Sequence, residues 1–145
     1  MSDRDALADL AADYARCVDR GDPEGVAACF APDGVLRRVD LAAGGKLLSE
    51  RTGREEIAKA ISRMTYNATF HFVGQQQADV DGDTATGETY CLAHHLTVPD
   101  DGSPATDFIM FIRYQDQFVR LDEGWRFAAR ELHIDWTENR LAEGV

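Results

Sequence analysis

The chain has 145 residues, 44% of them hydrophobic, which is typical of one globular domain with a single buried core. Its 15 basic and 26 acidic residues give a formal net charge of −11. A charge of this sign repels nucleic-acid phosphates and anionic lipid surfaces, so we expect neither nucleic acid nor a membrane as a partner.

The cysteines and the N-terminus indicate a reducing location. The cysteines are odd in number and lack a C-x-x-C pair, so we expect no disulfide framework and no zinc ribbon. The first residues lack a basic start followed by an apolar run, and no stretch approaches a membrane span. We therefore expect a cytoplasmic protein. The three cysteines are Cys17, Cys29 and Cys91.

The first predicted element is an amphipathic helix over residues 4–20, where apolar residues recur at spacings of three and four. Gly21 is expected to end this helix. A short second helix over residues 24–30 follows, with Asp22 as its N-cap and Pro23 at its first position.

Asp19 is not explained by these helix signals. It lies in the last turn of the first helix, where the helix macrodipole disfavours a carboxylate by roughly 0.3–1 kcal/mol. We therefore expect another part of the molecule to require this carboxylate.

A strand and a third helix complete the first half of the chain. Residues 31–34 (APDG) are expected to stop the second helix, residues 34–40 form a strand, and residues 47–48 are its short partner. Residues 52–55 have the spacing of a capping box that starts a third helix. The apolar stripe of this helix consists of Ile57, Ala58, Ile61 and Met64.

From residue 67 onward the hydrophobic period changes to two, which predicts strands linked by short turns. Four consecutive strands joined in this way form an antiparallel meander. Three helices followed by a meander indicate an α+β fold with the helices on one face of a sheet curled around them, in one domain over residues 1–145. The expected strands cover residues 68–80, 84–98, 107–121 and 124–136.

The strand at 107–121 carries large apolar residues on both faces. Because the helices cover only one face, the other must line a cavity or pack on another subunit, and we expect some of each. One face holds Phe108, Met110, Ile112 and Tyr114, and the other holds Ile109, Phe111 and Val119.

His71 is a candidate general base because it begins the first long strand, between Phe70 and Phe72. A histidine there is often a core or edge residue with satisfied ring nitrogens. Asp19 supplies the alternative, since a carboxylate that accepts from one ring nitrogen fixes the tautomer and raises the basicity of the other. Asp19 and His71 together would form a dyad that abstracts protons.

Several phrases, in order, resemble the SnoaL-like branch of the nuclear transport factor 2-like superfamily, which includes scytalone dehydratase, bile-acid 7-alpha-dehydratase and lindane dehydrochlorinase. The resemblance covers nearly the whole chain and implies a cone-shaped, cystatin-like fold whose curved mixed sheet and three helices enclose a deep apolar pocket. The phrases are Tyr-x-x-x-x-Asp from Tyr14, His-Phe at 71–72, VDGD at 80–83, Tyr-x-Asp from Tyr114, and Gly-Trp-Arg-Phe-x-x-Arg from Gly124.

The resemblance implies that Asp19 and His71 are the catalytic dyad, that Tyr14 is a catalytic tyrosine, and that Arg130 is a cavity arginine. Five residues along a helix turn about 140°, so Tyr14 and Asp19 do not share a helical face. A catalytic role for Tyr14 then requires either that the helix loosens near Asp19 or that the tyrosine side chain reaches around the helix. Arg130 either holds a substrate oxygen or forms a structural salt bridge, for which Asp19 is one possible partner.

The strand over residues 87–96 contains two adjacent histidines, and alternation lets only one of them face inward. The resemblance places Cys91 toward the pocket, so alternation selects His95 over His94 unless a bulge intervenes. His95 would hold a substrate oxygen, or else be a surface or interface histidine. The resemblance also makes Tyr114 a pocket wall, although packing is the alternative role.

No cofactor is expected. Asp19, His71 and His95 have the residue types of a two-histidine, one-carboxylate metal set, but they lack a compact ligand spacing, and no nucleotide or nucleophile motif is present. The sequence therefore favours a cofactor-independent lyase that acts on a small apolar cyclic metabolite by dehydratase-type elimination. An isomerase or cyclase of a steroid-like or polyketide-like substrate is the nearest alternative. A non-catalytic ligand-binding or assembly subunit is the other, and we expect a homodimer or homotrimer.

Overall fold

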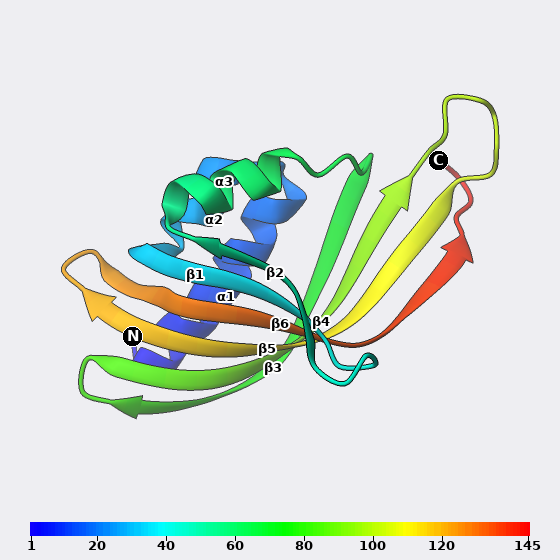
Figure 1. Cartoon of the computed structure of the whole chain (residues 1–145). Helices are drawn as coiled ribbons and strands as arrows, with labels where there is room; N and C mark the ends of the chain where they lie inside the picture. Colours follow the sequence, from blue (N-terminus) through cyan, green and yellow to red (C-terminus); the bar gives the residue numbers. More distant parts are fainter.

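A six-stranded sheet curls around three helices and forms a cone that is open at one end (Figure 1). The computed structural model describes all of residues 1–145. The α+β architecture predicted from the sequence is confirmed. The elements are α1 (Asp3–Asp19), α2 (Pro23–Ala28), β1 (Phe30–Asp40), β2 (Lys46–Thr52), α3 (Arg54–Ser62), β3 (Ala68–Asp81), β4 (Thr84–Thr97), β5 (Thr106–Leu121) and β6 (Gly124–Leu141).

The strand order is β2-β1-β6-β5-β4-β3, and only the β1–β6 pair is parallel. The last four strands are the antiparallel meander that the two-residue period predicts. β6 runs to Leu141, five residues beyond the predicted end at 136, because it remains paired with β5 as far as Thr106. The sheet is therefore mixed and unclosed.

Two local predictions in the first half were wrong. Residues 31–34 were expected to form a stop between the second helix and a strand, but they lie inside β1, whose register with β6 shifts between Phe30 and Val35. The third helix has no side-chain cap: Gly53 is its N-cap at φ 87°, and the Glu56 carboxylate instead accepts from the Thr52 N–H at 2.9 Å. The helix begins one residue later than the predicted capping box requires, so Thr52 precedes the N-cap and Glu56 takes the place expected for Glu55.

The core lies between the helices and the concave face of the sheet. The inward stripe of α1 is buried, as its three- and four-residue spacing predicts, and this burial stabilises a helix with exposed charges on its other face. None of the helices is long and apolar enough to cross a membrane. The fully buried apolar side chains are Leu7, Val26, Phe30, Ile57, Ala93 and Phe127.

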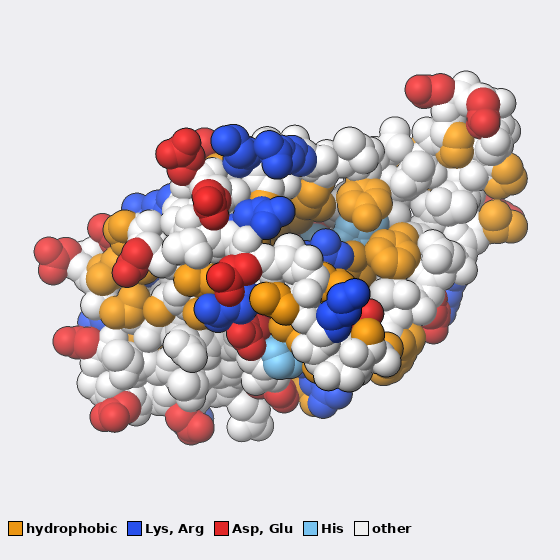
Figure 2. Space-filling view, viewed as in Figure 1, with side chains coloured by type: hydrophobic (Ala, Val, Ile, Leu, Met, Phe, Trp, Pro, Cys, Tyr) orange, Lys and Arg blue, Asp and Glu red, His pale blue; other side chains and the backbone are white.

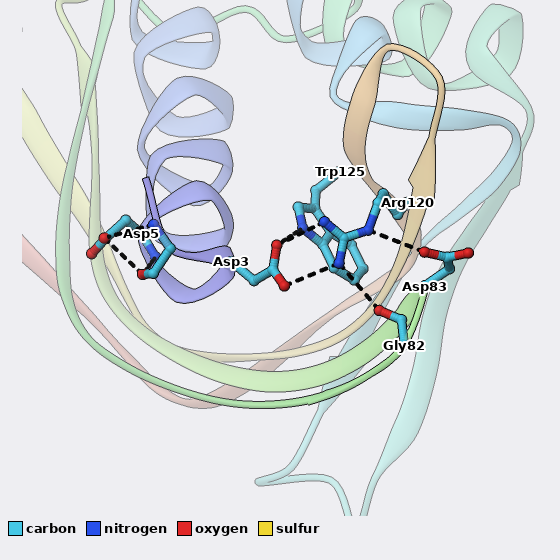
Figure 3. Close-up of polar contacts among 7 residues, drawn as sticks. Asp3, Asp5, Gly82, Asp83, Arg120 and Trp125 are labelled. Carbon is cyan, nitrogen blue, oxygen red and sulfur yellow. Dashed lines mark hydrogen bonds and ion pairs between the residues drawn. The ribbon is translucent and has the colours of Figure 1, made fainter.

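The first turn of α1 is fixed to the β5–β6 hairpin, which also contacts the β3–β4 hairpin (Figure 3). The Arg120 guanidinium donates to Asp3 at 2.8 and 3.0 Å and to Asp83 at 3.1 Å, and it lies 4.5 Å from the centre of the Trp125 ring. The Trp125 indole N–H also donates to Asp3, at 3.1 Å. Ser2 and Asp5 add a reciprocal capping box, so both side chains and backbone fix the start of this helix.

The ends of β3 to β6 project beyond the helices, toward the upper right of Figure 1. On their convex face, six apolar side chains form what we call the convex-face stripe, in which the rings of Phe111 and Trp136 stack at 4.2 Å. Phe70 is 65% exposed and Phe72 is 64% exposed, so no part of the chain covers the stripe. The stripe comprises Phe70, Phe72, Tyr90, Leu92, Phe111 and Trp136.

Candidate active site

A cavity of about 450 Å³ lies on the concave face of the sheet, between α1, α3 and strands β1 to β6. Eleven of its 18 lining residues are hydrophobic. Figure 2 shows hydrophobic and histidine surface in the hollow beside α3. The lining includes two histidines, His71 and His95, so two titratable imidazole rings border a largely apolar cavity.

Asp19 and His71 are in direct contact, as the sequence predicts. His71 Nδ1 lies 2.7 Å from Asp19 Oδ1, and the His71 backbone N–H donates to Asp19 Oδ2 at 3.0 Å. The Thr69 hydroxyl also donates to Asp19 Oδ1, at 2.9 Å. Three hydrogen bonds from β3 thus hold a carboxylate at the unfavourable end of α1, which accounts for its position in the sequence.

The protonation of His71 follows from these contacts. Because an ionised carboxylate only accepts, Nδ1 carries the hydrogen and Nε2 keeps its lone pair in the neutral ring. Burial lowers the pKa of His71, while the hydrogen bond and charge of Asp19 partly oppose that shift. Asp19 is not part of the cavity lining, so the ring turns Nδ1 away from the cavity and presents its opposite edge to it.

Tyr14 lines the same cavity, and α1 remains regular through Asp19. The helix does not loosen, and the tyrosine does not reach around it. Instead, Tyr14 points into the cavity while Asp19 contacts the far edge of the His71 ring, so the two residues use different helical faces, as their 140° separation requires. Burial raises the pKa of Tyr14 to about 12, so its hydroxyl is protonated at neutral pH and can donate.

His95 faces inward and His94 outward, as alternation from an inward-facing Cys91 predicts. The His95 ring lines the cavity with its centre 6.0 Å from that of His71, and its Nδ1–H donates to the Phe108 carbonyl at 2.9 Å. Burial lowers the pKa of His95, so the ring is neutral and Nε2 is its free acceptor. His94 pairs with Asp107 at 2.6 Å on the opposite face.

Arg130 is fully buried and is not among the cavity-lining residues. Its salt bridge is formed with Asp116, at 2.8 and 2.9 Å, and not with Asp19. The guanidinium lies 4.5 Å from the centre of the Tyr14 ring and 3.8 Å from that of Tyr114. Burial acts to lower the pKa of Arg130, but Asp116 outweighs it and raises that pKa, so the arginine stays charged.

The two remaining predicted wall residues also pack in the core. Cys91 and Tyr114 point to the inner face of the sheet but do not line the cavity. Burial raises the pKa of Cys91 to about 11, which leaves little thiolate at neutral pH. Tyr114 is a core residue whose ring centre lies 5.9 Å from that of Tyr14, so its surroundings match the packing role and not the role of a pocket wall.

Sequence reasoning missed several residues of this region. Thr69 is on the same strand face as His71, two residues before it, and this alternation could have identified it. Asp116 continues the inward alternation of β5, and a carboxylate among apolar residues indicates a buried cation such as Arg130. The arginines at the cavity, on three separate elements, left no local signal. They are Arg38, Arg51 and Arg63.

Comparison with known proteins supports the fold. A family model described as a SnoaL-like domain matches residues 1–131. A provisionally named scytalone dehydratase from Novosphingobium aromaticivorans DSM 12444 is 24% identical, with a TM-score of 0.79, and the match covers 98% of this chain and 90% of that chain. No curated protein matches the sequence.

Two further solved structures are similar in fold but differ from each other in stated function. A type 2 hexachlorocyclohexane dehydrochlorinase is 17% identical, with a TM-score of 0.75, covering 98% of this chain and 90% of that chain. The beta subunit of a provisionally named aromatic-ring-hydroxylating dioxygenase from N. aromaticivorans DSM 12444 is 18% identical, with a TM-score of 0.74, covering 91% and 88%. The shared fold therefore does not specify the chemistry.

Proposed function

We propose that this chain, which belongs to the SnoaL-like domain family, is a cofactor-independent lyase that eliminates water from a small, largely apolar cyclic substrate. The observation that carries the proposal is the 2.7 Å contact between Asp19 and His71 at the wall of an apolar cavity. A carboxylate that orients a neutral imidazole toward a largely apolar cavity is suited to proton abstraction.

The first step assigned to the dyad is removal of a proton from carbon. His71 Nε2 takes the proton, the C–H electron pair begins the new double bond, and the imidazolium that forms is stabilised by Asp19. Because its pKa is lowered by burial, His71 is neutral at pH 7 and ready to act as a base.

The second step is departure of the hydroxyl group. The C–O bond breaks as the double bond forms, and hydroxide leaves as water after it receives a proton. The Tyr14 hydroxyl is one donor, because its pKa of about 12 keeps it protonated, and the His71 imidazolium is the other. We assign Tyr14 to stabilising the developing negative charge, since it lines the same cavity.

His95 is assigned to substrate positioning. Its Nδ1–H is held by the Phe108 carbonyl, so Nε2 of the neutral ring accepts a hydrogen bond and is suited to a substrate hydroxyl. Arg130 does not line the cavity, and its guanidinium packs against the Tyr14 ring, which does. We therefore assign Arg130 to holding the Tyr14 ring in position. Cys91 and Tyr114 are assigned to packing of the same wall.

An isomerase or cyclase is the nearest alternative, because each of these reactions also begins with proton abstraction by His71. The distinction is the fate of the proton. A lyase releases water, whereas an isomerase returns the proton to another carbon of the same molecule. Product mass separates the two, since only elimination lowers it by one water.

The second candidate is a non-catalytic assembly subunit, which the exposed convex-face stripe favours. Trp136 is 52% exposed and stacks on Phe111, and six apolar side chains in one patch indicate a protein partner. An assembly subunit would use the stripe to bind a larger partner chain. We propose instead that the stripe binds a second or third copy of this chain, giving a homodimer or homotrimer. A monomer at micromolar concentration, measured by light scattering, would contradict this proposal.

The experiment that tests the dyad is an NMR titration of the His71 imidazole in the wild type and in Asp19→Asn. Removing a carboxylate at hydrogen-bond distance lowers the pKa of the imidazole, by roughly 1–3 units where the pair is buried. Glu131→Gln is the matched control, because that carboxylate contacts His133 at 3.0 Å, away from the cavity. An unchanged His71 pKa in Asp19→Asn would overturn the dyad.

The catalytic proposal is then tested with hydroxylated cyclic compounds, followed by the loss of one water in product mass. His71→Gln should lower the elimination rate by roughly 10²–10⁴-fold, the usual contribution of a general base. A variant that retains the full rate would contradict the assignment of His71.

A further inference from the structure

Three arginines line the cavity on the side away from the dyad. Arg38 is on β1, Arg51 is on β2, and Arg63 is the C-cap residue of α3. Arg38 and Arg63 are exposed, and Arg51 is half-buried, so the three side chains stand at the mouth of the cavity. Figure 2 shows basic side chains beside the hollow that holds the hydrophobic and histidine surface.

None of these three arginines has an acidic partner. Eight of the 15 basic side chains form ion pairs, whereas Arg38, Arg51 and Arg63 form none. The Arg51 guanidinium donates only to the backbone carbonyl of Glu50, at 2.8 Å. Four other basic side chains are also unpaired, so the distinguishing feature of Arg38, Arg51 and Arg63 is that all three line one cavity.

The cavity itself contains no acidic residue. The 18 lining side chains include three arginines and not one aspartate or glutamate, although the chain as a whole has a net charge of −11. The mouth is therefore a local positive region on a negative protein, and such a region attracts an anion that the remaining surface repels. Guanidinium groups also match the planar geometry of a carboxylate, with two parallel hydrogen bonds.

The sheet order separates the backbones of Arg38 and Arg51 from those of the histidines, although the charge of Arg38 still reaches His95 and adds to the effect of burial in lowering its pKa. β6 and β5 lie between β1, which carries Arg38, and β4, which carries His95. Three strand spacings correspond to about 14 Å between the backbones. The intervening cavity wall is apolar and includes Leu132, Met110 and Ile112. A ligand that reaches both ends has an anionic group, then an apolar body, then the reacting carbon.

We propose that the substrate is an amphipathic carboxylate whose anionic group is held by Arg38, Arg51 and Arg63 while its apolar ring system lies against the sheet. This inference deepens the proposed function and rests on it for the reaction at His71. The carboxylate is a handle remote from the bond that breaks, so its binding energy positions the reacting carbon against the base. Neutral analogues of the same shape bind the same cavity more weakly.

The test compares 2-naphthoate with 2-naphthamide, which share an apolar body and differ in charge. The protein contains three methionines, and two of them, Met64 and Met110, line the cavity while Met1 is 93% exposed. Methyl-¹³C methionine NMR therefore reads occupancy of the cavity directly, with Met1 as an internal reference. This readout is independent of binding to the convex-face stripe.

We expect 2-naphthoate to bind roughly tenfold or more tightly than 2-naphthamide at low salt, as a charge-assisted contact provides. Added salt should weaken the binding of 2-naphthoate but not that of 2-naphthamide, because salt screens exposed charges. Arg51→Gln and the pair Arg38→Gln with Arg63→Gln should each reduce the preference for naphthoate. Arg4→Gln is the matched control, since Arg4 is exposed, unpaired and outside the cavity lining.

Equal affinity for the two probes, or a preference that survives all three arginine substitutions, would overturn the proposal. Asp19→Asn should leave the preference intact, because Asp19 does not line the cavity. Failure of the anion site and failure of the base dyad are therefore observed separately: the first in the probe ratio, the second in the His71 titration.

Discussion

On the inner side of the sheet, two carboxylates each pair with a basic side chain, and the two pairs differ in what surrounds them. Asp116 and Arg130 meet at 2.8 Å with side chains 0% and 1% exposed, enclosed by three aromatic rings. Asp19 and His71 meet at 2.7 Å with side chains 26% and 6% exposed, and the imidazole borders a cavity. The contact distances are almost equal, so distance does not distinguish structural from chemical roles.

The difference lies in the basic partner and in its access to the cavity. Arg130 cannot release its proton at neutral pH and has no open space beside it, so its pair can only hold the fold together. His71 is neutral and has a free nitrogen edge toward the cavity, so its pair can exchange a proton. Four predictions sharpen this comparison.

The largest effect is expected for Asp116→Asn, which leaves the buried Arg130 charge unpaired. Breaking one partner of a buried pair typically costs about 3–5 kcal/mol of the free energy of unfolding, measured here by urea denaturation. Asp13→Asn is the control, because the exposed Asp13–Arg16 pair should contribute less than about 0.5 kcal/mol. Replacing both partners, with Asp116→Leu and Arg130→Met, should recover most of the loss.

A smaller effect on stability is expected for Asp19→Asn. The single amide oxygen can still accept from Thr69 or from the His71 backbone N–H, but not from both, because these donors contact different oxygens of the carboxylate. Removing the charge relieves the unfavourable helix end, so the free energy of unfolding should fall by only about 1–2 kcal/mol. The His71 pKa should nevertheless fall. A loss of stability as large as that of Asp116→Asn would mean that the Asp19–His71 pair stabilises the fold as much as the Asp116–Arg130 pair does.

Between pH 7.5 and about 5.5, the pH dependence of stability should come from the two cavity histidines, His71 and His95. Burial lowers the pKa values of His71 and His95 from 6.5, so the unfolded chain binds more protons than the folded one below that pH. Stability is then full above pH 6.5 and declines as the pH falls toward the folded-state pKa values. Urea denaturation between pH 7.5 and about 5.5 would measure the slope, before most surface carboxylates titrate.

Replacing both cavity histidines, with His71→Gln and His95→Gln, should flatten this slope. His133→Gln is the matched control, since that histidine contacts Glu131 outside the cavity. A slope that persists in the double variant would place the titrating group elsewhere.

The smallest effect is expected for Arg120→Ala at the exposed start of α1. Its ion pairs with Asp3 and Asp83 are surface contacts, which contribute little to global stability. The change should appear locally, as faster amide hydrogen exchange in the first turn of α1, with the His71 titration unchanged. Altered exchange throughout the sheet would contradict a local role.

Local patterns in the sequence were sufficient for most of the fold. The spacing in α1, the Asp22–Pro23 helix start and the two-residue period of β3 to β6 each depend on neighbouring residues, so they can be read without the tertiary structure. The same alternation allowed only one of the two adjacent histidines to face inward, and the family resemblance, which places Cys91 toward the pocket, selected His95. The wrong capping box at Thr52 shows the limit of a local signal, since pairing in β2 had already fixed that residue.

The partners within the site depended on contacts between distant parts of the chain. Asp19 was conspicuous because its charge opposes its own helix, but Thr69, its third hydrogen-bond donor, lies 50 residues away. Arg130 was recognised as a buried cation, yet its partner was Asp116 and not Asp19, because pairing of β5 with β6 sets these two residues opposite each other. Which charges meet is decided by strand register.

The sequence by itself therefore determined the elements, the α+β class and the candidacy of Asp19 and His71, because each rests on periodicity or on a residue that conflicts with its local surroundings. Only the tertiary structure decided which side chains border the cavity and which are enclosed beside it. Curvature of the sheet and the packing of α3 against it bring Arg38, Arg51 and Arg63 to one cavity, and the same curvature places Arg130 behind Tyr14. Burial and access are properties of packing, which no local stretch of sequence contains.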